Sequence, residues 1–188
     1  DVCSSDLQVF AHQRRIVQEL THHFDRIDVV TAESFEDSVV EGAYTLSTNW
    51  VPGRNLRNII NFYRITVPLL IRYRGGLLFS HMTEVQSFLC APICRILGIR
   101  HILWYAHKSS SFFLEYSLPF LNMVLTSTPG SCPIRGSKVV HIGQSVDQNL
   151  SKGVKERPKY PPTSWYHVGR IDPSKDLESM IKSLEFVR

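Results

Sequence analysis

Two basic residues, Arg170 and Lys175, stand where a predicted strand gives way to a helix. The stretch VGRIDPSKDL, residues 168–177, places both between the end of a strand and the first turn of a helix. A helix start offers free backbone N–H groups and a partial positive charge to an anion. A guanidinium grips a phosphate with two hydrogen bonds, and an ammonium adds a point charge. The pair is therefore a candidate phosphate site; the alternative is two solvated surface charges.

Two histidines stand at the ends of predicted strands. His107 follows the strand HILWYA, and His81 ends the strand of residues 77–82. In open parallel sheets, ligands bind beyond the carboxyl ends of the strands. A histidine there exchanges hydrogen bonds with a hydroxyl or titrates near neutrality. The alternative for both is a structural histidine, and for His107 a hydrogen-bonded loop residue. Lys108 and the serines at 109–111 add candidate polar contacts.

The other residues that could act as nucleophiles or metal ligands show no pattern of a catalytic or metal site. Cys90 and Cys94 lie four apart on a predicted helix, without a histidine or cysteine pair at ligand spacing nearby. Because zinc needs four ligands, we interpret them and Cys132 as small buried thiols in a reducing compartment. Ser127 lacks the G-x-S-x-G pattern of a hydrolase nucleophile. The remaining histidines, including His22, are interpreted as residues at solvated helix ends.

Strands and helices alternate along the chain that must position these residues. Hydrophobic spacing predicts helices over 8–24, 55–74, 84–97, 112–122 and from about 174, and strands over 27–32, 44–50, 77–82, 101–106, 123–128, 138–143 and 165–169. Such alternation predicts an α/β fold with a doubly wound, Rossmann-like parallel sheet covered on both faces. We expect one domain over residues 8–150, a charged, proline-rich linker over 151–163, and a second domain beginning near 164.

Composition excludes several classes of protein. The 188 residues are 43% hydrophobic and 20% charged, which rules out a disordered tail, a collagen-like repeat and a small disulfide scaffold. Residues 42–108 hold eight basic residues against Glu84 alone, a block that suits phosphates, anionic lipid headgroups or nucleic acid. The alternative is a solvated face balanced by the acidic residues 1–41. Arg64, Arg72 and Arg74 flank apolar residues on a predicted helix. This pattern favours an interior helix whose arginines reach solvent; the alternative is a helix that docks on an anionic membrane.

We expect the sequence to be truncated at both ends. Residues 1–7, DVCSSDL, resemble the translated tail of a sequencing adapter, so we leave them out of the fold prediction. We expect the first strand of the fold upstream of Gln8 and further sequence beyond Arg188.

Several motifs together resemble family-4 retaining glycosyltransferases of the GT-B fold. The stretch VGRIDPSKDL resembles the V-G-R-x-x-x-x-K-G/D-L pattern that opens their C-terminal domain, and IGQSVD at 142–147 resembles the I-x-x-G-V/I-D element before their linker. LWYAH at 103–107 and SHM at 80–82 resemble strand ends in one bacterial branch. Ser145 departs from the glycine of many members, which would strain a left-handed backbone by about 1 kcal/mol.

The resemblance implies roles for particular residues. Gly169, Arg170 and Lys175 would bind the donor phosphates, and no metal or other cofactor would be required. His107 would lie beside the transferred sugar as a catalytic residue, and His81 and Lys108 would line the acceptor side. The Gly-rich turn of the family would lie upstream of Gln8, and its E-x7-E motif beyond Arg188.

The implied activity is transfer of a sugar from a nucleotide-sugar donor to an acceptor hydroxyl with retention, in glycan, glycolipid or cell-envelope polysaccharide synthesis. The acceptor would be a glycan or a lipid-linked molecule rather than nucleic acid, and the protein cytoplasmic or peripheral on the inner face of the plasma membrane. The 188 residues alone are expected to be inactive. A sugar-nucleotide epimerase and a non-catalytic sugar- or nucleotide-binding module are the alternatives. A nicotinamide dehydrogenase is disfavoured because no G-x-G-x-x-G is visible.

Overall fold

The computed structural model of the protein describes residues 7–33, 40–143 and 176–183, with the backbone alone over 7–12. The chain divides into two compact units, residues 1–144 and 145–188. The described strands all belong to the first unit, and the second contributes one described helix. The predicted linker 151–163 and the predicted strand 165–169 lie outside the described residues.

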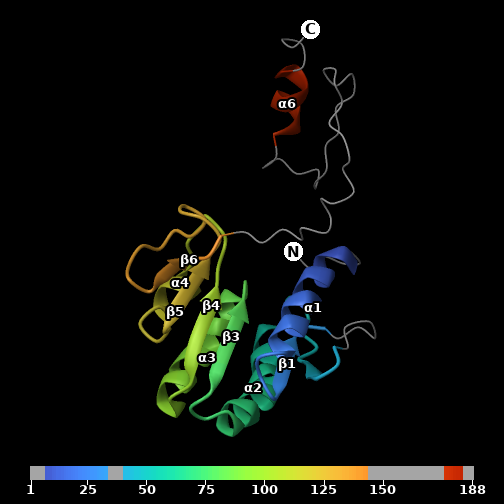
Figure 1. Ribbon diagram of the computed structural model, residues 1–188, viewed down its shortest axis with the longest axis vertical. Coiled ribbons are helices and arrows are strands. Elements are labelled where there is room, and N and C mark those ends of the chain that lie inside the picture. The colour runs from blue at the N-terminus through green and yellow to red at the C-terminus, as the bar shows by residue number, and fades with distance from the viewer. Residues whose placement is uncertain (1–6, 34–39, 144–175, 184–188) are drawn as a thin grey trace. The chain divides into compact units, whose positions relative to one another are not determined.

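The described elements follow the predicted alternation of strand and helix (Figure 1). The helices are α1 (Leu7–Thr21), α2 (Asn55–Arg72), α3 (Glu84–Leu97), α4 (Phe112–Ser117) and α6 (Leu177–Ser183). The strands are β1 (Ile27–Thr31), β2 (Ala43–Ser47), β3 (Leu77–His81), β4 (Arg100–Trp104), β5 (Met123–Thr126) and β6 (Val139–His141). The α/β class is therefore confirmed.

The described strands form two parallel sheets where we expected one. β1 pairs with β2, and the other sheet has the order β3-β4-β5-β6, which Figure 1 shows from green to orange. Every pair is parallel. Val30 of β1 and Leu78 of β3 pack against one core formed by α2 and α3, so the two sheets share a helix layer. Parallel sheets with helical crossovers are compatible with a Rossmann-like fold.

In the described part of the chain, helices pack against one face of the four-stranded sheet, whereas we expected cover on both. Side chains alternate between the faces of a strand. Ser80, Leu103 and Val124 share the buried face, against which α3 and α4 pack. Phe79 and Trp104 on the opposite face are half-buried. Within the described residues, the helix layer therefore protects one face of this sheet.

Helix α2 buries one side and exposes its arginines. Phe62 and Leu70 enter the core with the α3 cysteines, whereas Arg64, Arg72 and Arg74 are exposed. Leu56, Ile60 and Ile71 are exposed as well, so the solvent side of α2 combines arginines with apolar side chains. The helix runs through Pro68 without interruption, although proline lacks the N–H of a helical hydrogen bond.

Local signals set the helix ends. Gly98 ends α3 in the left-handed conformation, φ 67°, as its position in the sequence predicts. The Ser111 hydroxyl caps α4 by accepting from the Leu114 N–H. α4 ends at Ser117 and is shorter than the predicted 112–122. Leu118 still has a helical backbone, φ −50° and ψ −43°, but Pro119 has no N–H to extend the helical hydrogen bonds. The Asp176 carboxylate accepts from the Ser179 N–H at the start of α6.

The three described cysteines are buried free thiols, as predicted. Burial raises the pKa of Cys90 to about 12 and that of Cys94 to about 11. Both thiols therefore stay protonated at neutral pH and pack as small apolar groups. None of the described helices is long and apolar enough to span a membrane.

Candidate functional site

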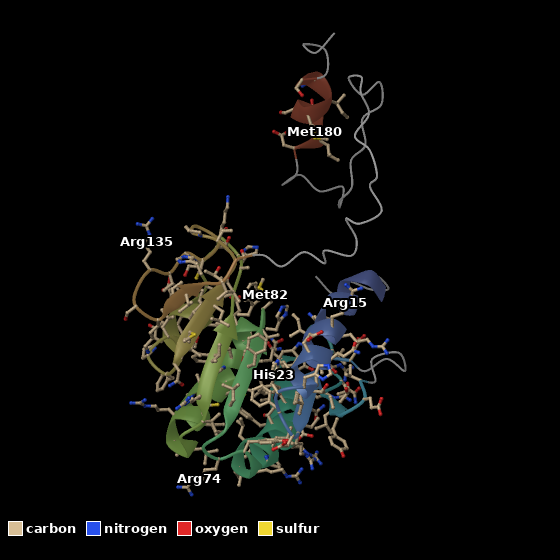
Figure 2. The ribbon with its side chains drawn as sticks, in the orientation of Figure 1. Arg15, His23, Arg74, Met82, Arg135 and Met180 are labelled. Carbon is tan, nitrogen blue, oxygen red and sulfur yellow. The ribbon has the colours of Figure 1, made fainter. Side chains whose placement is uncertain are left out.

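The carboxyl ends of β3 and β4 lie side by side and are tied together beyond the last paired residues. The Met82 N–H donates to the Trp104 carbonyl at 2.9 Å. The Ala106 N–H donates to the Met82 Sδ at 3.2 Å. Met82 has a φ of 55°, a left-handed backbone that these contacts hold in place. Figure 2 shows Met82 at this end of the sheet. The edge is therefore a fixed platform for the loops that follow both strands.

His107 lies on this platform, exposed, in the loop after β4. The Ser109 N–H donates to its Nδ1 at 3.2 Å, and the Ser109 hydroxyl lies 2.6 Å from the same nitrogen. Because a backbone N–H can only donate, Nδ1 is an acceptor, and the neutral ring carries its proton on Nε2. His107 is therefore the hydrogen-bonded loop histidine of the alternative interpretation. It also presents an Nε2–H donor at the predicted place.

His81 ends β3 and faces Trp104, its partner in the strand register. The two rings are stacked, with centroids 6.3 Å apart and an angle of 1° between their planes. The Phe79 ring is tilted against that of His81, with the two ring centroids 6.3 Å apart. His81 thus belongs to an aromatic row on the half-buried face of the sheet.

Lys108 is exposed and follows His107 directly. The neighbouring serines are held by local hydrogen bonds: Ser110 donates to Glu115 Oε1 at 2.6 Å, and Ser111 caps α4. The structure therefore brings His107, Lys108 and the serines together in one loop. His81 lies on the adjacent strand.

Glu84 is a site residue that sequence reasoning missed. It lies in the first turn of α3, where the helix dipole favours a negative charge. Its Oε2 is buried and has no hydrogen-bond partner within the described part of the chain. Burial and then the Glu84 charge raise the pKa of Tyr105, whose hydroxyl donates to the Ser109 carbonyl at 2.8 Å. The available signal was that Glu84 is the single acid in residues 42–108.

Tyr105 links this carboxylate to the histidine. Its ring meets that of His107 edge-on, with centroids 6.4 Å apart. A carboxylate oxygen, an imidazole N–H and an ammonium group thus border one edge of the sheet. Such a mixture of acceptors and donors suits a ligand rich in hydroxyl groups.

His101 is a buried structural residue, not the solvated helix-end histidine that we predicted for the remaining histidines. It lies in β4 with no exposed surface. Its Nε2 is 2.9 Å from the Ser80 hydroxyl and 3.2 Å from that of Ser87. Burial lowers its pKa to about 4, so the ring is neutral at pH 7. The prediction was wrong because it considered only the polarity of His101. The residue lies in an apolar strand, and this strand carries its side chain into the core.

The predicted donor-phosphate residues Gly169, Arg170 and Lys175 lie outside the described residues, as does Ser145. Leu177, which begins α6, is half-buried, and Ile181 of the same helix is exposed. Within residues 7–33, 40–143 and 176–183, no three histidine, cysteine, aspartate or glutamate side chains are grouped to hold a metal ion.

Comparison of the chain with protein-family models, with curated proteins and with solved structures finds no match.

Proposed function

We propose that the protein is a glycosyltransferase that moves a sugar from a nucleotide-sugar donor to an acceptor hydroxyl with retention, in the synthesis of a glycan, a glycolipid or a cell-envelope polysaccharide. The observation that carries the proposal is His107, held at the carboxyl end of β4 with Nδ1 occupied by Ser109 and a proton on Nε2. The sequence pattern at 168–177 supports it independently.

In this proposal, His107 acts as a hydrogen-bond donor. Its Nε2–H donates to an oxygen of the transferred sugar and so fixes the sugar ring relative to the acceptor. The Glu84 carboxylate acts through Tyr105, which lies between it and His107. His81 and Lys108 line the acceptor side.

The leaving group is a nucleoside diphosphate. As the bond between the anomeric carbon and the phosphate oxygen breaks, negative charge grows on that oxygen. Arg170 and Lys175 stabilise this charge, and Gly169 allows the backbone to approach the phosphates. The new bond forms between the anomeric carbon and the acceptor oxygen, whose proton passes to the departing phosphate oxygen. Fixed cations supply the electrostatic stabilisation that such a step requires.

Nucleotide titration by calorimetry tests the proposal. UDP, GDP and ADP are added to the 188-residue protein, with and without Mg²⁺. One of them is expected to bind without metal. Arg170→Ala and Lys175→Ala each weaken that binding by about 1.5–3 kcal/mol, the scale of a hydrogen bond to a charged group. Lys182→Ala is the matched control, because this exposed lysine of α6 already pairs with Glu178 at 2.7 Å.

The alternatives give different results. A nucleotide that binds equally to the wild type and both variants, or no binding at all, contradicts the donor-site assignment. An epimerase would release free nucleoside diphosphate without an acceptor product. A non-catalytic module would bind the nucleotide-sugar and leave it intact.

A further inference from the structure

A cavity of about 330 Å³ lies between the β1–β2 sheet and the C-terminal half of α2. Its walls combine charged and apolar side chains: Arg26, Asp28, Tyr44, Leu46, Arg64, Ile65, Pro68, Leu69 and Arg72. It is separate from the candidate site. The cavity is lined by side chains from β1, β2 and α2, whereas His81 ends β3 and His107 lies in the loop after β4. Figure 2 shows Arg74, two residues beyond α2, at the opposite end of the unit from Met82.

Strand register explains why these side chains meet. Asp28 and Tyr44 are partners across the parallel pair, so they point to the same face of the sheet. Leu46 shares that face because it lies two residues beyond Tyr44. On α2, Ile65, Leu69 and Arg72 recur at helical spacing and face it.

One of the three arginines is neutralised within the cavity wall. The Arg26 guanidinium donates from Nε and Nη2 to the two Asp28 oxygens at 3.3 and 3.4 Å, and it lies 4.6 Å from the centre of the Tyr44 ring. The Tyr73 hydroxyl donates to the same carboxylate. Burial alone would raise the pKa of Asp28, but the hydrogen bonds from Tyr73 and Arg26 hold it below its ordinary value. Asp28 is therefore charged at neutral pH, and its carboxylate is already hydrogen-bonded to Arg26 and Tyr73.

Arg64 and Arg72 are not neutralised in this way. Both are exposed on α2, and neither makes an ion pair or a side-chain hydrogen bond within the described residues. Arg72 is close enough to Asp28 to lower the pKa of that carboxyl. With three guanidiniums against one carboxylate, the cavity keeps an excess of two positive charges.

We propose that this cavity binds a phosphomonoester group. A phosphomonoester carries close to two negative charges at neutral pH and matches the excess charge of the cavity. Two guanidinium forks offer paired N–H donors to its oxygens. The apolar wall of Leu46, Ile65 and Leu69 suits the carbon group that carries the phosphate. This site is independent of the proposed glycosyl transfer.

Calorimetric titration with glycerol 3-phosphate tests the site. Arg64→Gln and Arg72→Gln each remove one guanidinium and are expected to raise the dissociation constant at least tenfold. Arg57→Gln is the matched control, because Arg57 is exposed on the same helix but does not line the cavity. It is expected to leave the dissociation constant within twofold of the wild type. Circular dichroism confirms that all variants fold.

Vesicle sedimentation separates the two sources of the phosphate. Vesicles of phosphatidylcholine, with and without phosphatidic acid, are mixed with the same proteins. Binding that requires phosphatidic acid and is lost in Arg64→Gln supports the cavity with a lipid headgroup as its ligand. Binding of glycerol 3-phosphate without vesicle binding supports it with a soluble ligand. The proposal is overturned if neither glycerol 3-phosphate nor the vesicles bind. It is also overturned if Arg57→Gln weakens binding as much as Arg64→Gln does, because the attraction would then come from the general positive charge of α2. Neither result depends on Arg170 or Lys175, so failure here is distinct from failure of the proposed function.

Discussion

At the carboxyl end of β4, His107 is held by a neighbour in the same loop, whereas beside α2 the Asp28 carboxylate is held both by its neighbour Arg26 and by Tyr73 from a distant part of the chain. His107 bonds to Ser109, two residues away, but Asp28 accepts from Tyr73, 45 residues away. The first arrangement leaves the Nε2–H of the exposed His107 ring for a hydroxyl-rich ligand. The second concentrates guanidiniums around a hollow. A local hydrogen bond thus positions the single donor of His107, whereas tertiary packing brings the three arginines of the cavity together.

The packing around the two regions also differs, and core truncation gives the largest expected effect. Leu103 is fully buried beneath the β4 edge, whereas Leu46 lines the cavity and is half-buried. Leu103→Ala is expected to lower the free energy of unfolding by about 3 kcal/mol, because it removes apolar contacts and leaves a void. Leu46→Ala is expected to cost about 1 kcal/mol. Urea unfolding measures the change in unfolding free energy of both variants. Equal changes would contradict the difference in packing between the two regions.

Acid stability gives the next effect, and it comes from the four-stranded sheet. His101 has a pKa lowered from 6.5 to about 4, so the unfolded chain takes up a proton that the folded chain refuses. The contribution is therefore present above pH 6.5 and is lost as the pH falls toward 4, by up to about 3 kcal/mol. His101→Leu should flatten the unfolding free energy over this window relative to the wild type. An unchanged pH profile in that variant would place the titration elsewhere.

The cavity wall responds in a lower pH range and more weakly. The pKa of Asp28 is lowered, so its stabilisation is present above its unfolded value of 3.8 and is lost as the pH falls through the folded pKa. At pH 7, Asp28→Asn is expected to cost about 1 kcal/mol, since it weakens the hydrogen bonds from Arg26 and Tyr73. Thermal unfolding at pH 7 and pH 3 measures this. A cost that is the same at both values would show that the charge of Asp28 is unimportant.

Sequence reasoning predicted elements that depend on local signals. The bounds of α3 follow from apolar spacing and from Gly98, which alone among the common residues accepts a left-handed backbone without strain. The place of His107 follows from the end of an apolar strand. These features need only a few neighbouring residues, and the structure bears out the elements at these positions.

Features that depend on tertiary contacts were missed. The division into two sheets depends on which strand edges meet, and strand composition does not encode that. His101 is buried because Ser80 and Ser87, from different elements, lie against its ring. The cavity was not predicted because its cations come from two separate segments, the residue before β1 and helix α2, although the arginines of α2 were recognised as unusual.

The central claim, that His107 contacts the transferred sugar, is tested most directly by NMR of the histidine side chains during titration. The nucleotide-sugar whose nucleotide binds in calorimetry is added to ¹⁵N-labelled protein, in the Arg64→Gln background to exclude phosphate binding in the cavity. We predict a proton on Nε2 of His107 before addition. The His107 ring resonances should then shift with the nucleotide-sugar but not with the nucleotide alone, while those of buried His101 stay in place. His107 resonances unchanged at saturation would contradict the account.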